Sequence, residues 1–395
     1  MRPTKILSHD NLFSAYRHSR DYGNNPSSVG IDNTTAKTFK ANHQHNISEL
    51  AKDIRSGSYH QQLLRLALIP KGTNSHRPVC IPTIRDRIVQ RAISRYLMGS
   101  TVKLGMSQQV SYGFLKGFGS ANDAVKMAIT KRTKKRYIVK TDISKFFDEI
   151  DRSELVEMLN SVHMSPSLIP ILIEVIRSEV KIKSPLEMER FKKSGLQKKR
   201  GLRQGMPLSP LLASIYLRDF DKAIIKQKIS FLRYADDLII FGKDKGEAIK
   251  GFEAVRESLS RLGLQVPTLG NEKSELREPR QSVEYLGQEI AYNQNTDSYY
   301  TRIPQNSIDR ILKAVAEMDL AKSIYNQETL STVFRKLDSR SSSYDAYFSE
   351  ASNLATFKKR VSDEVRRTKK KIFWDLFGPA ALELKPNEKR FLGWD

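Results

Sequence analysis

Residues 231–242 read Phe231-Leu232-Arg233-Tyr234-Ala235-Asp236-Asp237-Leu238-Ile239-Ile240-Phe241-Gly242, which places two adjacent carboxylates between two short apolar runs. Both runs are rich in residues that favour strands, and the break between them is short and polar, so the sequence predicts a β-hairpin with the two aspartates at its tip. Two neighbouring anions repel each other, and a pair of divalent metal ions is the usual reason for a fold to keep them together. Taken alone, an exposed Asp-Asp turn is the simpler interpretation, because such dipeptides are common in loops.

A second acidic strand end favours the metal interpretation. Residues 136–142 are typical of a strand that carries Asp142 at its C-terminal end. Asp142 together with the two hairpin aspartates is the ligand set of a two-metal phosphoryl-transfer centre, in which one ion activates a primer 3′-hydroxyl and the other holds the triphosphate. Asp148 and Asp151 follow closely, but neither falls at the strand end, so we predict that they are surface or helix-capping groups.

A series of short blocks between residues 70 and 290 carries a resemblance to a known family. In chain order, the blocks are Arg77–Gln90, Ser111–Phe114, Thr141–Phe147, Gly201–Pro210, Tyr234–Asp237, Leu262–Leu264 with Lys273, and Tyr285–Gly287. With these blocks, the chain resembles the bacterial reverse transcriptases related to group II intron proteins and retrons. Each block is weak by itself, whereas the whole series in the family's order is specific.

The resemblance implies an α+β fold of the right-hand polymerase type, with fingers, a palm built on an antiparallel sheet, and a helical thumb. It divides the chain into an N-terminal extension and fingers (1–118), a palm segment with the first carboxylate (119–152), further fingers residues (153–205), a palm segment with the carboxylate hairpin and primer grip (206–303), and the thumb and C-terminal tail (304–395).

Local patterns predict several elements within this frame. Capping motifs at 83–86 and 120–123 each predict the start of a helix. Residues 207–229 have the apolar spacing of one long helix, and residues 290–303 are typical of a β-hairpin. From Gln305 to residue 375 the apolar periodicity predicts three or four helices.

The resemblance also assigns the metal-binding residues. Asp142, Asp236 and Asp237 are implied to be the catalytic metal ligands, with Asp237 further from the ions than the other two. The carbonyl of Ile143 is implied as an additional ligand. The implied cofactor is a pair of Mg²⁺ ions, with Mn²⁺ as an alternative.

Two blocks are implied to surround the incoming nucleotide. Phe147 matches the family's aromatic gate, whose ring leaves no room for a 2′-hydroxyl and so favours dNTP over NTP. The alternative is that Phe147 belongs to the core and Phe146 is the gate. The same resemblance puts Gln204 against the incoming nucleotide, and Gly205 allows close approach of the backbone.

Three further groups are implied to handle the triphosphate and the primer. Lys71 and Arg77 flank the turn at 72–75 and resemble fingertip cations that close on the triphosphate. Lys273 lies where the family has a lysine near the leaving pyrophosphate, where it could act as a general acid. Its glutamate neighbours make a surface salt-bridge cluster the alternative. Residues Tyr285, Leu286 and Gly287 are implied to form the primer grip.

The composition predicts a polyanionic partner. The chain has 395 residues, 67 of them basic and 44 acidic, with a net charge of +23 and a pI of about 9.8. Nucleic-acid affinity comes largely from phosphate neutralisation, so this excess favours nucleic acid. Cys80 is the only cysteine, which excludes an internal disulfide. We expect no signal region and no membrane span, and therefore a cytoplasmic protein.

The branch of the family follows from elimination. The retron signatures Asn-Ala-x-x-His and Val-Thr-Gly are absent from the sequence. Residues 341–348 and 357–360 resemble the thumb of stand-alone bacterial reverse transcriptases, several of which belong to the abortive-infection and defence-associated group. The resemblance therefore implies an antiphage enzyme with dNTPs as substrates, a non-coding RNA as template, a DNA product, and in some members a homo-oligomer.

Three alternatives stay open from the sequence. One is a template-independent nucleotidyltransferase on the same palm, which would make homopolymer without added RNA. Another is a retron or group II intron type of reverse transcriptase or maturase. The third, from a different class, is a degenerate RNA-binding protein without catalysis, against which the intact carboxylates, Phe147 and Gln204 argue.

Overall fold

A computed structural model describes residues 3–23, 28–71, 75–99, 104–107, 109–113, 119–162, 164–318, 320–325, 328–379 and 383–391. The chain forms two compact units, which we describe separately. The first comprises 1–118, 141–240 and 249–275, and the second comprises 119–140, 241–248 and 276–395. The predicted fingertip turn at 72–74 and Phe114 lie outside the described residues. The division into fingers, palm and thumb stays a prediction.

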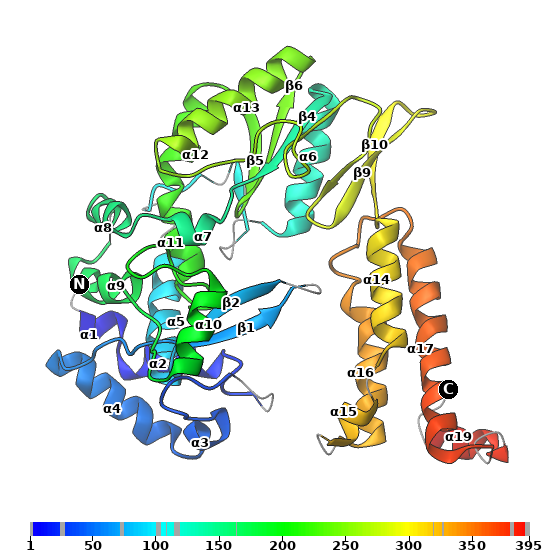
Figure 1. Cartoon of the computed structure of the whole chain (residues 1–395), viewed down its shortest axis with the longest axis horizontal. Coiled ribbons are helices and arrows are strands. Elements are labelled where there is room, and N and C mark those ends of the chain that lie inside the picture. The colour runs from blue at the N-terminus through cyan, green and yellow to red at the C-terminus, as the bar shows by residue number, and fades with distance from the viewer. Residues whose placement is uncertain are drawn as a thin grey trace. The chain divides into compact units, whose positions relative to one another are not determined.

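The N-terminal part of the first unit is helical (Figure 1). Its helices begin at polar caps: the side chains of Ser8, Thr35 and Thr83 accept hydrogen bonds from backbone amides at the starts of α2, α3 and α5. This confirms the helix start predicted at Thr83. Helix α2 packs against α4 and α5. The bounds are α1 Pro3–Ile6, α2 His9–Arg17, α3 Ala36–Ala41, α4 His43–Ser56 and α5 Ile84–Met98.

A two-stranded antiparallel hairpin follows, made of β1 (Arg65–Pro70) and β2 (His76–Ile81). Arg65 pairs with Ile81 at one end and Pro70 with His76 at the other. The next segments are helical: α8 Arg152–Asn160, the 3₁₀ turn Pro166–Leu168, α9 Ile169–Ile176 and α10 Pro185–Ser194. Helix α10 lies against the β1–β2 hairpin (Figure 1).

The five-stranded sheet carries the predicted carboxylate hairpin, β5–β6, and has the order β3-β5-β6-β4-β7. It is mixed rather than wholly antiparallel, because β3 pairs in parallel with β5. The predicted helix over 207–229 is interrupted at Leu217, which separates α11 from α12. The bounds are β3 Ser111–Tyr112, β4 Tyr137–Asp142, α7 Phe146–Glu149, α11 Ser209–Tyr216, α12 Arg218–Lys226, β5 Ser230–Tyr234, β6 Asp237–Gly242, α13 Lys245–Ser260 and β7 Glu275–Arg277.

The second unit combines α6, a three-stranded sheet of order β10-β9-β8, and C-terminal helices. The predicted hairpin over 290–303 is confirmed as β9–β10. Arg132 of α6 is fully buried, lies 4.5 Å from the centre of the Tyr299 ring and donates from Nη1 to the Ile290 carbonyl at 3.2 Å. The bounds are α6 Ala121–Lys134, β8 Val283–Tyr285, β9 Gln288–Asn293 and β10 Ser298–Arg302.

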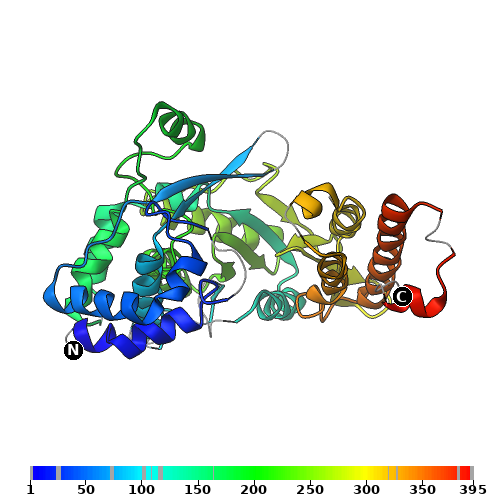
Figure 2. The same ribbon diagram turned by 90° about the horizontal axis from the view of Figure 1, so that it is seen from below.

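The helical C-terminal region, predicted from periodicity, is confirmed. Helices α14 and α16 both pack against α17, and the two views show the three side by side (Figures 1 and 2). Their apolar faces bury one cluster that includes Ile308, Val315, Leu337, Val361 and Phe373. The bounds are α14 Gln305–Ala316, α15 Leu320–Tyr325, α16 Leu330–Ser343, α17 Leu354–Phe377 and α19 Pro386–Phe391. The α+β class is therefore confirmed. Among the described residues, no helix is both long and apolar enough to cross a membrane.

Candidate active site

Strand β4 and the β5–β6 hairpin bring the predicted carboxylates together. Asp142 is the last residue of β4, and Asp236 lies in the hairpin turn directly before β6. The amide of Ile143 donates to the Asp236 carbonyl at 3.0 Å, which ties the end of β4 to the turn. The structure therefore places Asp142, Ile143 and Asp236 at one edge of the sheet, with Asp237 next along the hairpin.

A buried ion pair holds the hairpin turn in shape. Arg233, on β5, is 1% exposed and binds both oxygens of Asp221 on α12, at 2.9 and 2.5 Å. It also donates to the Ala235 carbonyl at 3.0 Å and to the Ser111 hydroxyl at 2.8 Å. Ala235 has φ of +59°, an uncommon conformation for a residue with a Cβ. Arg233 therefore fixes the backbone directly before Asp236. Sequence analysis missed this pair because its partner lies on a different element.

Negative charge at this edge is only partly neutralised. The Lys273 ammonium lies 2.8 Å from Asp142 Oδ2, and this bond raises the pKa of Lys273. Among the described residues, Asp142 Oδ1 is buried and has no hydrogen-bond partner. Burial, together with the charge of Asp142, raises the pKa of Asp236, although Arg77 and Lys273 offset part of that rise. The ion pair with Asp142 also gives Lys273 a partner at the site, beyond the neighbouring glutamates that the sequence suggested.

These features fit a hard divalent cation. Mg²⁺ prefers carboxylate and carbonyl oxygens, which are what Asp142, Asp236 and the adjacent backbone supply. The Oδ1 of Asp142 has no hydrogen-bond partner among the described residues, and burial disfavours the charged form of Asp236, so a bound cation would stabilise both carboxylates. Within the described ranges, no three Asp, Glu, His or Cys side chains are already grouped around one metal position. The Lys273 ammonium occupies Asp142 Oδ2, one of the oxygens that would bind a cation.

The loop that contains Gln204 lies against the β1–β2 hairpin. Gln204 accepts from Arg77 Nε at 2.9 Å through its side chain and from the Cys80 amide at 2.7 Å through its carbonyl. Gly205 has φ of +102°, and a Cβ there would lie 2.7 Å from the Cys80 carbonyl oxygen, so only glycine fits. The structure thus brings Arg77, Gln204 and Gly205 together. Lys71 is exposed at the end of the hairpin, where its amide donates to Ser75 at 2.7 Å.

The two neighbouring phenylalanines differ in exposure. Phe146 is 2% exposed and belongs to the core, whereas Phe147 is partly exposed. Their rings touch, with centres 5.4 Å apart. The Phe147 carbonyl accepts from the Leu202 amide at 2.7 Å, which connects it to the loop with Gln204. Of the two rings, Phe147 is therefore the one that a nucleotide could reach. Asp151 caps α8 through bonds to the amides of Ser153 and Glu154, as predicted.

The predicted primer grip belongs to the second unit. Tyr285 ends β8, and Leu286 and Gly287 both have positive φ, of +50° and +67°. The Tyr347 hydroxyl donates to the Leu286 carbonyl, and a Cβ at Gly287 would lie 3.3 Å from that hydroxyl. The turn is therefore a tight one, shaped around Tyr347.

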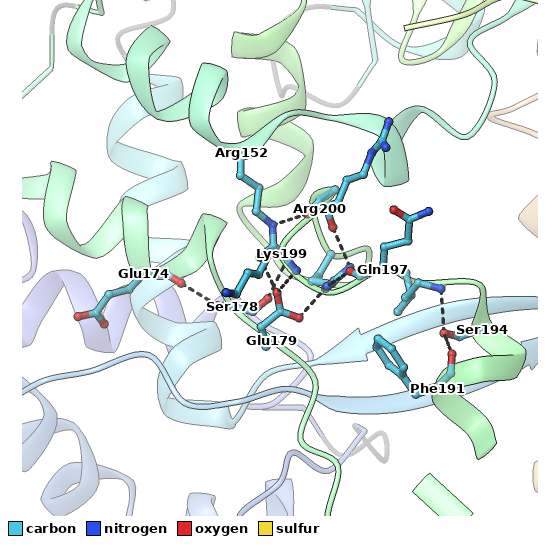
Figure 3. A network of polar contacts seen from close by, with 12 residues as sticks. Arg152, Glu174, Ser178, Glu179, Phe191, Ser194, Gln197, Lys199 and Arg200 are labelled. Atoms are coloured by element: carbon cyan, nitrogen blue, oxygen red, sulfur yellow. Dashed lines mark hydrogen bonds and ion pairs between the residues drawn. The ribbon is translucent and has the colours of Figure 1, made fainter. Parts of the chain in front are cut away.

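The side chain of Glu179 holds the loop at 197–204 in place through several hydrogen bonds (Figure 3). Its Oε1 accepts from Arg152 at 2.6 Å and from the Lys199 amide at 2.9 Å, and its Oε2 accepts from Arg203 at 2.7 Å. Arg152 and Arg203 are almost fully buried and also donate to backbone carbonyls, including that of Gly201. Burial raises the pKa of Glu179, but the bonds from Arg203 and Lys199 outweigh it, so the net shift is downward. No sequence pattern signals this network, because its members come from separate segments.

The residues proposed for this site lie within a segment that matches a known protein family. The family model described as reverse transcriptase (RNA-dependent DNA polymerase) matches residues 69–290, which include all the blocks quoted above. The chain belongs to this family. Membership supports the predicted right-hand polymerase fold.

Among curated relatives, the group II intron-encoded protein LtrA of Lactococcus lactis subsp. cremoris is 28% identical over 236 residues, or 59% of this chain and 37% of that protein. Protein YkfC of Escherichia coli (strain K12) is 26% identical over 205 residues, 51% of each. This chain thus spans about half of YkfC and little more than a third of LtrA. A solved telomerase from Candida albicans, in complex with a fragment of telomeric RNA, has 12% identity and a TM-score of 0.46, over 91% of this chain and 69% of that one. A likeness at this TM-score adds nothing to the assignment.

We expect Glu179→Gln to destabilise the first unit. The variant leaves the buried guanidinium groups of Arg152 and Arg203 without a counter-charge, which should cost roughly 3 kcal/mol, the lower end for buried pairs because Glu179 is 28% exposed. Urea unfolding at pH 7 measures the change. Glu189→Gln is the matched control, because Glu189 pairs with Lys193 on the surface and should change stability by under about 0.5 kcal/mol.

The difference in unfolding free energy between Glu179→Gln and wild type should become smaller at acidic pH. A carboxyl whose pKa is lowered on folding contributes stability above its unfolded pKa, ordinarily 4.5, and loses that contribution as the pH falls through the folded value. Equal stabilities of the two proteins at pH 7 would contradict the bracing role.

Proposed function

We propose that this chain is an RNA-directed DNA polymerase that extends a DNA strand from dNTPs on an RNA template by two-metal phosphoryl transfer. The observation that carries the proposal is the placement of Asp142 and Asp236 on adjoining strand ends, with Asp142 Oδ1 buried and without a hydrogen-bond partner among the described residues, in a chain of the reverse transcriptase family. Paired carboxylates of this kind suit two divalent cations better than any arrangement of protein cations.

In this proposal the residues have separate roles. Asp142, Asp236, Asp237 and the Ile143 carbonyl hold two Mg²⁺ ions, for which Mn²⁺ is the alternative. Bound ions would activate the primer hydroxyl and stabilise the leaving pyrophosphate. Lys273 neutralises Asp142 before substrate arrives and then donates a proton to the pyrophosphate.

The substrate side is formed by the finger hairpin and the loop beside it. Arg77 binds the triphosphate as a fork and Lys71 as a point charge. Gln204 contacts the nucleotide while the Arg77 bond orients its amide. Phe147 closes the space below C2′, and the turn at Tyr285, Leu286 and Gly287 positions the primer.

The biological setting is a finer part of the proposal. We propose a cytoplasmic antiphage enzyme that copies a partner non-coding RNA and can act as a homo-oligomer, on the basis of its likeness to stand-alone bacterial reverse transcriptases. A second candidate is a group II intron type of function, which the similarity to LtrA favours. Sequencing the RNA and DNA that co-purify with the protein would distinguish the two, because an intron transcript would identify the second. Homopolymer made without added RNA would instead indicate a template-independent nucleotidyltransferase.

Replacing Asp236 and Asp237 together with asparagine should abolish dNTP incorporation while RNA binding persists. The two amides keep the shape of the turn but lose the charge that holds metal, so the loss should appear in turnover rather than in binding. Single-nucleotide extension and RNA titration measure the two quantities. Asp10→Asn, an exposed change on α2, is the control and should behave as wild type. Substantial extension by the double variant would remove these residues from the site.

Phe147→Val should raise the use of NTP relative to dNTP, because the smaller side chain opens the space below C2′. Matched single-nucleotide incorporation with dNTP and NTP measures the ratio. Phe146→Ala is the comparison: its ring is buried, so truncation should cost about 3–5 kcal/mol of stability. A folded Phe147→Val enzyme with unchanged sugar selectivity would show that the gate lies elsewhere.

RNA affinity should be strongly salt-dependent. With a net charge of +23, several phosphates should be neutralised on binding, so affinity should fall by orders of magnitude between ~50 and ~200 mM salt. Fluorescence anisotropy with a labelled RNA gives the slope. A flat profile would mean that the basic surface does not contact the nucleic acid.

A further inference from the structure

The first unit contains a cavity of about 360 Å³ that none of the proposed roles uses. Its walls come from the start of β1, the segment 180–183, helix α10 and the loop at 30–33. The segment is tied to β1 by backbone bonds: the Leu64 amide donates to Glu179 at 2.8 Å, and the Lys181 amide donates to Leu64 at 2.9 Å. Since α10 also packs against β1, the cavity is bounded by ordered elements rather than by loops alone.

The lining of this cavity is strongly basic. Of the described residues that line it, four are cations, Arg65, Lys181, Lys183 and Arg190, and one is an acid, Glu187. Among the described residues, none of the four cations has an ion pair within 4.0 Å. The Glu187 carboxylate accepts from the Lys183 backbone amide at 2.5 Å, and its charge offsets only part of the lowering of the Lys181 pKa by Lys183.

Two of these cations are held close together. Lys181 and Lys183 are two residues apart, both line the cavity, and their ammonium groups interact. The adjacent Lys183 ammonium lowers the pKa of Lys181. The two neighbouring positive charges repel each other, and an anion bound between them would be attracted to both.

The chemistry of the lining indicates phosphate. Arginine binds phosphate as a fork and lysine as a point charge, and both kinds are present. Among the described residues that line the cavity, none is aromatic, so none of them could stack on a nucleobase. The volume lies in the range of small-ligand sites and exceeds what one simple ion needs.

The cavity is separate from the proposed triphosphate site. Strand β1 begins at Arg65, in the cavity wall, and ends at Pro70, next to Lys71. At about 3.3 Å per residue, these ends are roughly 17 Å apart. A phosphate bound in the cavity is therefore a different group from the triphosphate that Lys71 and Arg77 are proposed to bind.

We propose that this cavity is a second anion site that binds closely spaced phosphate groups without selecting a base. The phosphates belong either to an RNA strand or to a free oligophosphate, and both present the same chemistry to the four cations. Binding at this cavity does not require catalysis, so this proposal is independent of whether the chain polymerises DNA.

The test compares two charge-matched double variants of the full chain. Lys181→Gln with Lys183→Gln removes two cations from the cavity. Lys192→Gln with Lys193→Gln removes two from α10 outside the cavity lining. Inorganic tripolyphosphate is titrated by calorimetry in EDTA, so that no divalent ion recruits it to the carboxylates. We expect the cavity variant to bind it roughly tenfold or more weakly than wild type and the control variant. Thermal melts verify folding, and Lys183→Gln alone replaces the double variant if that protein is unstable.

A second arm uses a short single-stranded RNA and identifies the source of the phosphates. If the site binds an RNA strand, the cavity variant loses RNA affinity relative to the control variant and tripolyphosphate competes with RNA. If the ligand is a free oligophosphate, RNA affinity matches that of the control variant while tripolyphosphate binding is lost. Equal affinities of the cavity and control variants for both probes would overturn the proposal.

Discussion

Repulsion between carboxylates at one edge of the sheet is the constraint on which the rest of the first unit depends. Asp142 and Asp236 come from separate strands, and the Ile143 amide holds them at adjoining positions. Such an arrangement is unfavourable unless other groups fix the backbone and supply positive charge. The Arg233–Asp221 pair fixes the backbone, and Lys273 supplies part of the positive charge. Among the described residues, Asp142 Oδ1 is left without a hydrogen-bond partner, and this is the oxygen at which the proposed metal ions would bind.

Part of the positive charge of this protein is structural. Arg132, Arg152, Arg203 and Arg233 are all almost fully buried, and each donates to backbone carbonyls as well as to any carboxylate partner. One guanidinium can satisfy several carbonyls that no secondary structure pairs, which suits turns and loop junctions. The net charge of +23 therefore overstates the charge available to a polyanion. The positive charge that a polyanion can reach lies on solvent-accessible side chains, such as those of Lys181 and Lys183 in the cavity lining.

Local patterns predicted the parts of the fold that depend on neighbours in sequence. The hairpin around Asp236, the helix starts at Thr83 and Ser120, and the hairpin at 290–303 all follow from periodicity and capping, which act over a few residues. The break at Leu217 was missed, because the apolar spacing continues through it. For the site, strand ends predicted that Asp142 and Asp236 would approach. The bonds from Lys273 to Asp142 and from Arg77 to Gln204 join distant segments, so only the folded chain reveals them.

Glu179 belongs to two hydrogen-bond systems at once. Its backbone carbonyl accepts from the Leu64 amide directly before the β1–β2 hairpin, and its side chain accepts from the loop at 197–204. A pivot of the hairpin at its base would therefore pull the loop with it, and a shift of the loop would tilt the hairpin. We therefore expect the base of the hairpin and the loop at 197–204 to move together rather than independently.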